Sequence, residues 1–186
     1  MKQEIRKRIT SLRVFMRQRG ISAFIVPSTD PHSGEYVPAH WESRKWISGF
    51  TGSAGTAVIT TQDGGLCTDS RYFLQAADQL EDTGIKLFKD RLPETPSIAE
   101  WLGSVLHAGE KVGIDGWVNT TEEAESLRAS LSSQGLELVS VNDPFETLWK
   151  DRPSLPLNAP FILPTEYAGV SCSDKLAQIR ESLCRN

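Results

Sequence analysis

Long hydrophobic runs are missing from this 186-residue chain. No stretch approaches the roughly 20 consecutive apolar residues that a membrane-spanning helix needs. The amino-terminal segment MKQEIRKRITS carries positive charge, but no apolar run follows it as one would in a secretory signal. These absences predict a protein that does not contact a membrane and that resides in the cytoplasm.

Neither sign of charge dominates the sequence. It holds 20 Lys and Arg against 24 Asp and Glu, a formal net charge of -4, and it has no acidic or basic tail. A surface that binds nucleic acid depends on clustered positive charge that neutralises phosphates. The composition therefore excludes nucleic acid from the expected partners.

Cysteine and histidine are scarce, with three of each. The cysteines Cys67, Cys172 and Cys184 include no C-x-x-C pair, which predicts reduced, buried thiols in a reducing compartment. The histidines form no H-x-x-x-H or H-E-x-x-H pair, the spacings that place two ligands on one helix face. We therefore expect neither a metal site nor a cofactor in this chain.

Helical and strand patterns alternate along most of the sequence. The first helix is expected over 2–19, where apolar residues recur every three or four positions before Gly20 ends the pattern. Thr120 and Glu123 have the spacing of a capping box, which predicts the start of a later helix. The other expected helices cover 41–47, 72–80, 98–106 and 120–135. The expected strands cover 21–26, 56–60, 66–68, 85–88, 111–115 and 136–141.

The order of these elements predicts the fold class. The turn residues DGG, Asp63 to Gly65, separate the strands at 56–60 and 66–68, which indicates a tight antiparallel hairpin. The remaining strands alternate with helices, as they do where strands pair in parallel. We expect an α/β fold of three layers, α/β/α, with a mixed, mostly parallel sheet that contains one antiparallel hairpin.

The carboxyl-terminal part has a different character. The segment RPSLPLNAP, Arg152 to Pro160, has three prolines in nine residues and is expected to be a linker. A helix is expected over 173–183, with Ser173 or Asp174 as its N-cap. Its apolar stripe has no partner in the sequence that follows. The expected division is a domain over 1–157, followed over 158–186 by a linker and the start of a second domain.

The stretch GFTGSAGTAVIT, Gly49 to Thr60, raises the question of a phosphate-binding loop. In such a loop a strand enters and a helix leaves, so that the helix amino terminus faces the phosphate. Here a helical pattern enters and a β-branched strand leaves, and the lysine of a Walker motif is missing. The order favours glycines that allow positive φ and close backbone contact where a helix turns into a sheet.

Several short motifs occur in a recognisable order: DPHSGEY, RKWISGFTGSAGTAVIT, TDSRYFLQA, VGID and NDPFETLWKDRP. Together they resemble the N-terminal domain of Xaa-Pro aminopeptidases (aminopeptidase P) of the long, three-domain form, in the creatinase/prolidase superfamily. The segment ILPTEYAGVSCSDKL resembles the start of that family's middle domain. The resemblance covers nearly the whole chain and implies a domain with a ribonuclease H-like motif.

The resemblance also implies a function for a longer parent protein. Members of the family remove the N-terminal residue from peptides with proline in second position. Their C-terminal domain holds two metal ions, usually Mn²⁺, and no residue of this chain matches its ligands or catalytic groups. We expect a parent that is a homodimeric metallopeptidase with two Mn²⁺. We expect this chain alone to be inactive and to have as partners the remaining domains and a proline-containing peptide.

One residue inherits a role from the resemblance. The Arg of the T-D-x-R-Y motif, here Arg71, corresponds to an arginine that reaches toward the bound peptide. Without the resemblance, an ordinary salt bridge of Arg71 with Asp69 or Asp30 would be favoured. Both interpretations remain open from the sequence.

The loop HSGEY supplies the other candidates for substrate binding: His32, Glu35 and Tyr36. The family's loop commonly reads H-x-S-E-Y, from which this sequence departs in the middle. A polar loop after a buried strand stands where α/β sheets often bind ligands. The alternative is that His32 and Glu35 form hydrogen bonds within their own loop.

A second function remains possible from another class of protein. Creatinase-like domains also occur as protein-binding modules in proteins that have lost the peptidase chemistry, although the TDSRY motif favours the peptidase. The tryptophans are expected in the core or at domain interfaces; they are Trp41, Trp46, Trp101, Trp117 and Trp149.

Overall fold

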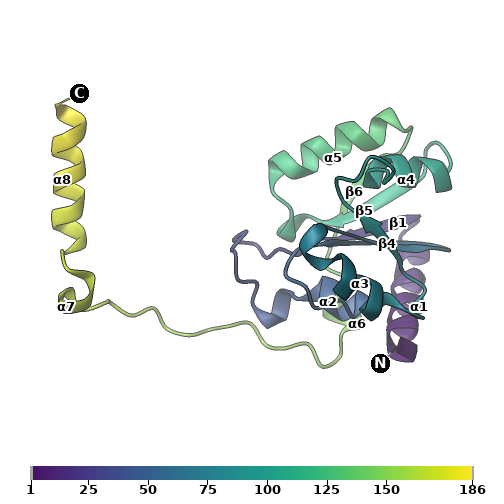
Figure 1. Ribbon diagram of the computed structural model, residues 1–186, viewed down its shortest axis with the longest axis horizontal. Helices are drawn as coiled ribbons and strands as arrows, with labels where there is room; N and C mark the ends of the chain where they lie inside the picture. Colours follow the sequence, from purple (N-terminus) through teal and green to yellow (C-terminus); the bar gives the residue numbers. More distant parts are fainter. Residues whose placement is uncertain (1, 186) are drawn as a thin grey trace. The chain divides into compact units, whose positions relative to one another are not determined.

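The structure is a computed structural model that describes residues 2–185. It contains two compact units, Met1–Leu155 and Pro156–Asn186. The first unit holds a six-stranded sheet between two layers of helices, and the second holds two helices. Figure 1 shows the elements of both units.

The sheet has the strand order β4-β3-β2-β1-β5-β6. β2 is antiparallel to both of its neighbours, whereas the other three pairings are parallel. The prediction of a mixed, mostly parallel sheet with a hairpin is therefore confirmed, and the hairpin is β2–β3. Its second strand starts at Gly64, two residues earlier than the pattern predicted. The strands are β1 Ala23–Val26, β2 Thr56–Thr60, β3 Gly64–Thr68, β4 Lys86–Lys89, β5 Lys111–Asp115 and β6 Glu137–Val141.

Helices cover both faces of this sheet, as predicted (Figure 1). One face packs against α1 Lys2–Gln18, α2 Ser43–Ser48, α3 Phe73–Leu80 and α6 Phe145–Leu148. The other face packs against α4 Ile98–Val105 and α5 Thr121–Ser133. Three short 3-10 helices lie in the connections: η1 Ala39–Trp41, η2 Ser70–Tyr72 and η3 Gly116–Val118. The sequence patterns do not predict α6 or the 3-10 helices as separate elements.

A separate hydrophobic core lies on each face of the sheet. On the first face, the apolar stripe of α1 packs with residues of β1 and β2 such as Phe24 and Ile59. On the second face, Trp101 and Leu102 of α4 pack with Val58 of β2 and other strand residues. Burying one such large side chain contributes about 1.5–3 kcal/mol, so both cores help to hold the three layers together.

The tryptophans divide between core and surface. Trp46 and Trp101 are buried, and Trp41 and Trp149 are half-buried. Trp117 is 74% exposed, so of the two expected places, the core or a domain interface, it does not lie in the core of this domain. Its place in η3, directly after β5, puts it at the end of a strand rather than under a helix.

Two capping boxes fix the starts of α4 and α5. The predicted box at α5 is confirmed: the Thr120 hydroxyl accepts a hydrogen bond from the Glu123 amide, and the Glu123 carboxylate accepts one from the Thr120 amide. Ser97 and Glu100 make the same pair of hydrogen bonds at α4. Each box satisfies amide groups that the first turn leaves without partners.

The glycine stretch turns α2 into β2, in the order that the sequence indicates. Gly49 ends α2 with a left-handed φ of 76°. A side chain at Gly52 would meet the Phe50 ring at 2.3 Å, and one at Gly55 would meet the Cys67 carbonyl oxygen at 3.0 Å. These glycines therefore serve positive φ and close contact, as the sequence analysis proposed.

The carboxyl-terminal unit consists of an irregular segment, α7 Thr165–Ala168 and α8 Cys172–Cys184. The N-cap of α8 is Ser171, whose hydroxyl accepts a hydrogen bond from the Asp174 amide. The predicted caps, Ser173 and Asp174, are wrong because both lie inside the first turn. The helix starts earlier than expected because Ser171, rather than a later residue, has the extended backbone of a cap.

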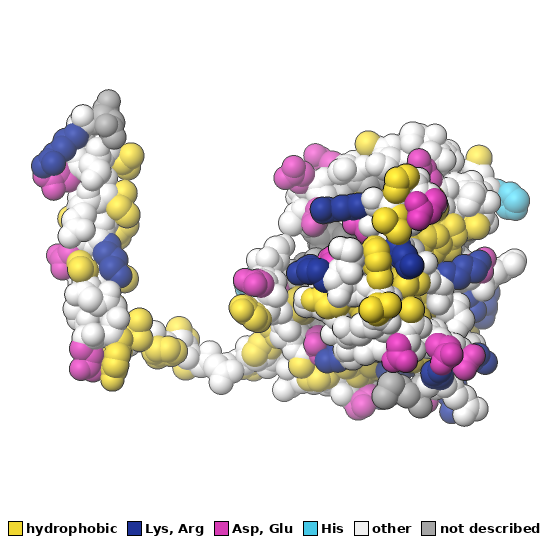
Figure 2. Space-filling view, viewed as in Figure 1, with side chains coloured by type: hydrophobic (Ala, Val, Ile, Leu, Met, Phe, Trp, Pro, Cys, Tyr) yellow, Lys and Arg dark blue, Asp and Glu magenta, His cyan; other side chains and the backbone are white. Residues whose placement is uncertain are grey.

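The apolar stripe of α8 lies on the surface of its unit. Leu176, Ile179 and Leu183 are 52%, 56% and 70% exposed. In Figure 2, hydrophobic side chains lie along one side of this helix. The cysteines at its two ends, Cys172 and Cys184, are also exposed, which corrects the expectation of three buried thiols.

None of the helices in the described part of the chain is long and apolar enough to cross a membrane.

Candidate functional site

The loops at the carboxyl ends of the parallel strands gather most of the predicted site residues. The loop 27–38 follows β1, η2 follows β3, and η3 follows β5. The glycine stretch meets the same edge, because β2 runs the opposite way and begins there. We call these four segments together the carboxyl edge. In sheets of this class such edges are the usual place for ligands.

Arg71 lies in η2 on the carboxyl edge. Its Nε donates to Oδ1 of Asp69 at 2.9 Å, and its Nη2 donates to Oδ2 at 2.8 Å. These hydrogen bonds lower the pKa of Asp69 to about 2. The Arg71 side chain nevertheless stays 66% exposed. The salt bridge foreseen in the sequence analysis is therefore present, and the guanidinium remains open to solvent.

Asp30, the other predicted partner of Arg71, has a different role. It is buried, and its Oδ1 accepts hydrogen bonds from the amides of His32 and Gly34 at 2.8 and 3.4 Å. Asp30 therefore organises the loop after β1 instead of pairing with Arg71.

The loop residues predicted to bind substrate are exposed. The His32 side chain is 90% exposed, and its Nδ1 lies 4.0 Å from Oδ1 of Asp30. Tyr36 is 86% exposed. Glu35 and Tyr36 line a hollow of about 220 Å³ together with Ser53 of the glycine stretch. Asp30 thus accepts the hydrogen bonds found within this loop, and the Glu35 side chain takes part in none of them.

Arg44, which the sequence analysis did not single out, holds the glycine stretch. It is 6% exposed and donates from Nε to Oγ of Ser28, from Nη1 to the carbonyl of Phe50 and from Nη2 to the carbonyl of Gly52. Burial lowers the pKa of Arg44 to about 10. The sequence shows this arginine only as one of several charges in a helix, so nothing local marks it as buried.

Two further contacts tie the glycine stretch to the helix after Arg71. The Thr51 amide donates to Oε1 of Gln79 in α3 at 2.9 Å. The hydroxyl oxygens of Ser53 and Tyr72 are 2.7 Å apart. The segment that directly follows Arg71 is therefore anchored to the glycine stretch by side-chain hydrogen bonds, which helps to hold the backbone that carries the exposed guanidinium.

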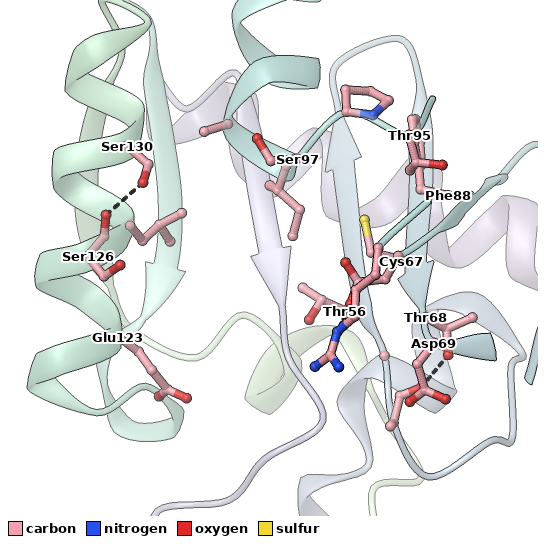
Figure 3. A pocket seen from close by; sticks show the side chains of 18 of the residues that line it. Thr56, Cys67, Thr68, Asp69, Phe88, Thr95, Ser97, Glu123, Ser126 and Ser130 are labelled. Carbon is pink, nitrogen blue, oxygen red and sulfur yellow. Dashed lines mark hydrogen bonds and ion pairs between the residues drawn. The ribbon is translucent and has the colours of Figure 1, made fainter. Parts of the chain in front are cut away.

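A groove of about 710 Å³ opens beside this edge, between α5 and the strands β2 to β4 (Figure 3). Its floor is a row across three strands, because Thr56 stands opposite Cys67 and Cys67 stands opposite Phe88. Ser126 and Ser130 of α5 line the facing wall. The groove exists because α4 begins only at Ile98 and leaves this half of the sheet face uncovered.

The cysteine on the floor of this groove is not activated for chemistry. Burial raises the pKa of the Cys67 thiol to about 12, and the nearby Asp90 adds to the shift. A thiol with so high a pKa is protonated and unreactive at neutral pH. Within residues 2–185, no cluster of three or more His, Cys, Asp or Glu side chains could hold a metal ion.

Known proteins match this chain in sequence. The Creatinase/Prolidase N-terminal domain family matches residues 8–148. A protein of Laccaria bicolor named "Probable Xaa-Pro aminopeptidase P" is 42% identical over 179 residues, which are 95% of this chain and 28% of the relative. "Xaa-Pro aminopeptidase 1" of Dictyostelium discoideum is 37% identical over 191 residues, 98% of this chain and 30% of the relative. The chain thus spans less than a third of these relatives.

Solved structures match it as well. An X-prolyl aminopeptidase from Caenorhabditis elegans, described as a cytosolic enzyme with a di-nuclear active site, superposes with a TM-score of 0.77 and 33% identity. That match covers 89% of this chain and 27% of the other. The N-terminal domain of the cytoplasmic peptidase PepQ from Mycobacterium tuberculosis matches with a TM-score of 0.57 and 26% identity, over 76% of this chain and 98% of the other.

The second of these matches is to an N-terminal domain whose structure was solved alone, and it covers nearly all of that domain. The first is to one part of a larger chain. Since the domain match extends from residue 8 to residue 148, this chain belongs to the creatinase/prolidase N-terminal domain family.

Proposed function

We propose that this chain is the non-catalytic N-terminal domain of an Xaa-Pro aminopeptidase, a metallopeptidase that removes the residue before proline from the start of a peptide. One observation carries the proposal. Relatives named Xaa-Pro aminopeptidase match the chain over 95% of its length but over only 28% of their own. The matched part belongs to a family described as an N-terminal domain.

The catalytic groups belong, in this proposal, to the rest of the parent protein. That part would hold two Mn²⁺ ions, which would supply an activated water for hydrolysis of the peptide bond. The nematode relative with a di-nuclear active site supports a parent with two metal ions and a cytoplasmic location. A homodimeric parent completes the proposal. This chain contributes no catalytic residue and no metal ligand.

The domain boundary belongs to the same proposal. We assign 1–157 to the N-terminal domain and 158–186 to a linker and the start of a second domain. The division of the structure between Leu155 and Pro156 supports this assignment. The exposed apolar residues of the second unit, including Ile162 at 94%, would pack against the remainder of that second domain.

Arg71 is the residue that we propose to contact the peptide substrate. Asp69 uses its Nε and Nη2 donors, while Nη1 makes no hydrogen bond with any described residue. A guanidinium fixed on one side and free on the other can donate to a carbonyl or carboxylate of a bound peptide. The exposed His32, Glu35 and Tyr36 would provide further contacts along the same edge.

The test is to substitute Arg71→Ala in the complete parent enzyme and to measure kcat/KM for Xaa-Pro peptides of two, four and eight residues. We expect a loss of roughly tenfold for the longest peptide, since a hydrogen bond to a charged group is lost, and little change for the dipeptide. An equal loss at every length would contradict the proposal and would give Arg71 a structural role.

Arg91→Ala is the matched control. Arg91 is 88% exposed and pairs only loosely with Asp90, at 3.6 Å, so its removal takes away the same charge from a neighbouring loop. We expect kcat/KM to be unchanged for all three peptides. A length-dependent loss in this variant as well would show that general charge, and not Arg71, selects the longer substrates.

A protein-binding module of a pseudo-peptidase is the alternative. Exposed apolar side chains around the carboxyl edge favour it to some extent, since Tyr36, Leu74 and Trp117 are 86%, 90% and 74% exposed. The complete parent protein decides between the two functions. Cleavage of an Xaa-Pro peptide in the presence of Mn²⁺ supports the peptidase, and its absence in a folded, metal-saturated parent supports the module.

A further inference from the structure

A second hollow, of about 450 Å³, opens at the carboxyl end of β5. Asp115, the last residue of β5, lines it together with Trp117 of η3 and Trp41 of η1. Asp143 and Glu146, which follow β6, line the same hollow. We call it the Trp117 pocket. It shares one lining residue, Trp41, with the hollow at Glu35. It contains neither Arg71 nor Asp69.

The topology of the sheet singles out this place. β1 and β5 are adjacent and parallel. After β1 the chain continues to α2 on one face of the sheet, and after β5 it continues to α5 on the other face. Where neighbouring strands send the chain to opposite faces, a crevice opens beyond their carboxyl ends, and α/β proteins bind ligands there. The Trp117 pocket lies at this point of the sheet.

The charge in the pocket is not balanced by the protein. Asp115, Asp143 and Glu146 bring three carboxylates, and Arg152 brings one positive charge. Arg152 is already paired with Asp143, since its Nη1 donates to Oδ2 at 2.5 Å and both side chains are at least nine-tenths buried.

Asp115 is the carboxylate of this pocket for which no salt bridge is found among residues 2–185. The residue is only 5% exposed, and its Oδ1 accepts a hydrogen bond from the Trp117 amide at 3.0 Å. Its second oxygen, Oδ2, accepts no hydrogen bond from any residue within 2–185. Burial raises the pKa of Asp115 above its ordinary value, and the charges of Asp143 and Glu146 add to this shift, whereas the Trp117 amide and the charge of Arg152 oppose it. A buried carboxylate in this state gains from a positively charged ligand.

The neighbouring Arg152 shows which cation such a place holds. Its guanidinium lies 5.1 Å from the ring centroid of Trp41 and 5.9 Å from that of Trp149, while Asp143 accepts its hydrogen bond. A tryptophan face and an aspartate therefore already hold an arginine in this part of the fold. Trp117 and Asp115 offer the same two groups, and Trp117 is exposed.

We propose that the Trp117 pocket binds the guanidinium of an arginine side chain from another polypeptide, with Asp115 accepting its N–H groups and Trp117 covering its planar face. The occupant is set by charge and shape: two uncompensated carboxylates attract a cation, and the indole of Trp117 favours a flat one. The Glu146 side chain, at the exposed side of the pocket, adds a second acceptor.

The test uses the 186-residue chain itself, labelled with ¹⁵N, and follows the indole N–H resonance of Trp117. Trp117→Phe identifies that resonance by its loss. The probe is N-acetylarginine N-methylamide, and its uncharged isostere N-acetylcitrulline N-methylamide is the control. We expect the arginine probe to shift the resonance in a saturable way and the citrulline probe to leave it in place. Equal shifts by both probes would overturn the proposal.

Variants locate the interaction. Asp115→Asn should weaken binding of the arginine probe about tenfold, and Glu146→Gln about twofold, because a buried carboxylate contributes more than an exposed one. Glu122→Gln, an exposed glutamate of α5 outside the pocket, should leave binding unchanged. If Asp115→Asn does not fold, the exposed Glu146→Gln still decides the matter at the Trp117 indole, and Trp117→Leu decides it at the backbone amide resonances of residues 115–118. Unchanged binding in these variants would overturn the proposal.

The ammonium ion is the remaining comparison. N-acetyllysine N-methylamide carries the same charge but has no planar group that could stack on Trp117. We expect it to bind at least about threefold more weakly than the arginine probe. Equal or tighter binding of the lysine probe would overturn the assignment of a guanidinium.

Discussion

Arg44 contacts Phe50 in two ways: its Nη1 donates to the Phe50 carbonyl at 2.5 Å, and its guanidinium lies 4.9 Å from the centroid of the Phe50 ring. No carboxylate pairs with this buried arginine among the described residues. Its charge is instead distributed over two carbonyl oxygens and the Ser28 hydroxyl. The guanidinium thus gives the carbonyls of the glycine stretch the hydrogen bonds that a neighbouring strand gives within a sheet.

Substituting Arg44→Met should therefore destabilise the domain strongly. Two buried carbonyls would lose their donors, so we expect the free energy of unfolding to fall by about 2–4 kcal/mol. Urea unfolding followed by tryptophan fluorescence measures the change. Lys45→Met is the matched control, because Lys45 is the next residue and is 44% exposed; it should change stability by less than about 0.5 kcal/mol. Similar losses in both variants would contradict this role of Arg44.

The glycine at position 52 gives a second test of the same region. A Cβ atom on Gly52 would lie 2.3 Å from the Phe50 ring and 2.8 Å from the Tyr72 ring, so Gly52→Ala forces both rings to move. We expect a loss of about 1–3 kcal/mol in thermal or urea unfolding. Gly34→Ala is the control, because its nearest neighbour would be an Asp30 oxygen at an ordinary 3.7 Å. A stable Gly52→Ala variant would show that the stretch can rearrange.

The pair of Asp69 and Arg71 should respond to acid. The pKa of Asp69 lies at about 2, below its ordinary 3.8, so its ionised form is favoured in the folded state. The contribution to stability is therefore present above about pH 4 and is lost as the pH falls toward 2. Carbon-13 shifts of the Asp69 carboxyl group measure this titration. In Arg71→Ala the pKa should return toward 3.8, and an unchanged value would contradict the pairing.

The three thiols should differ in reactivity. Cys172 and Cys184 are exposed, whereas the Cys67 pKa of about 12 leaves roughly one thiolate in ten thousand thiols at pH 8. We expect a chromogenic disulfide reagent to modify two thiols of the native protein quickly and the third only after unfolding. Cys67→Ser should keep both rapid equivalents. Rapid reaction of all three thiols would show that the groove opens more widely than the structure indicates.

Much of the fold was predictable because its signals are local. The bounds of β2 and β5 agree with their sequence patterns, since short segments with β-branched residues mark both: TAVIT in β2, and Val112 and Ile114 in β5. The α1 stripe and the capping box of α5 need only residues three or four positions apart. These elements depend on neighbours along the chain, and the sequence shows such neighbours directly.

The site was less predictable because its contacts join distant parts of the chain. In the sequence, Arg44 looks like a charge on the surface of a helix. Only the fold brings the carbonyls of residues 50 and 52 within hydrogen-bond distance of it. In the sequence, Asp115 looks like an ordinary residue at the end of a strand. Only the fold places Asp143 and Glu146, which follow β6, in the same pocket. The sequence left two candidate partners for Arg71, and the folded structure pairs it with Asp69 while Asp30 is buried in its own loop. Local patterns cannot contain such information.

One edge of the sheet is formed by a short strand with positive charge at both ends. β4 forms one edge, and its four residues begin and end with lysines, Lys86 and Lys89. A short, charged border strand discourages the backbone of a second molecule from adding to the sheet, and so protects the protein from aggregating through its strands. Oligomers of this protein that form by extending the sheet past β4 would have to desolvate both ammonium groups.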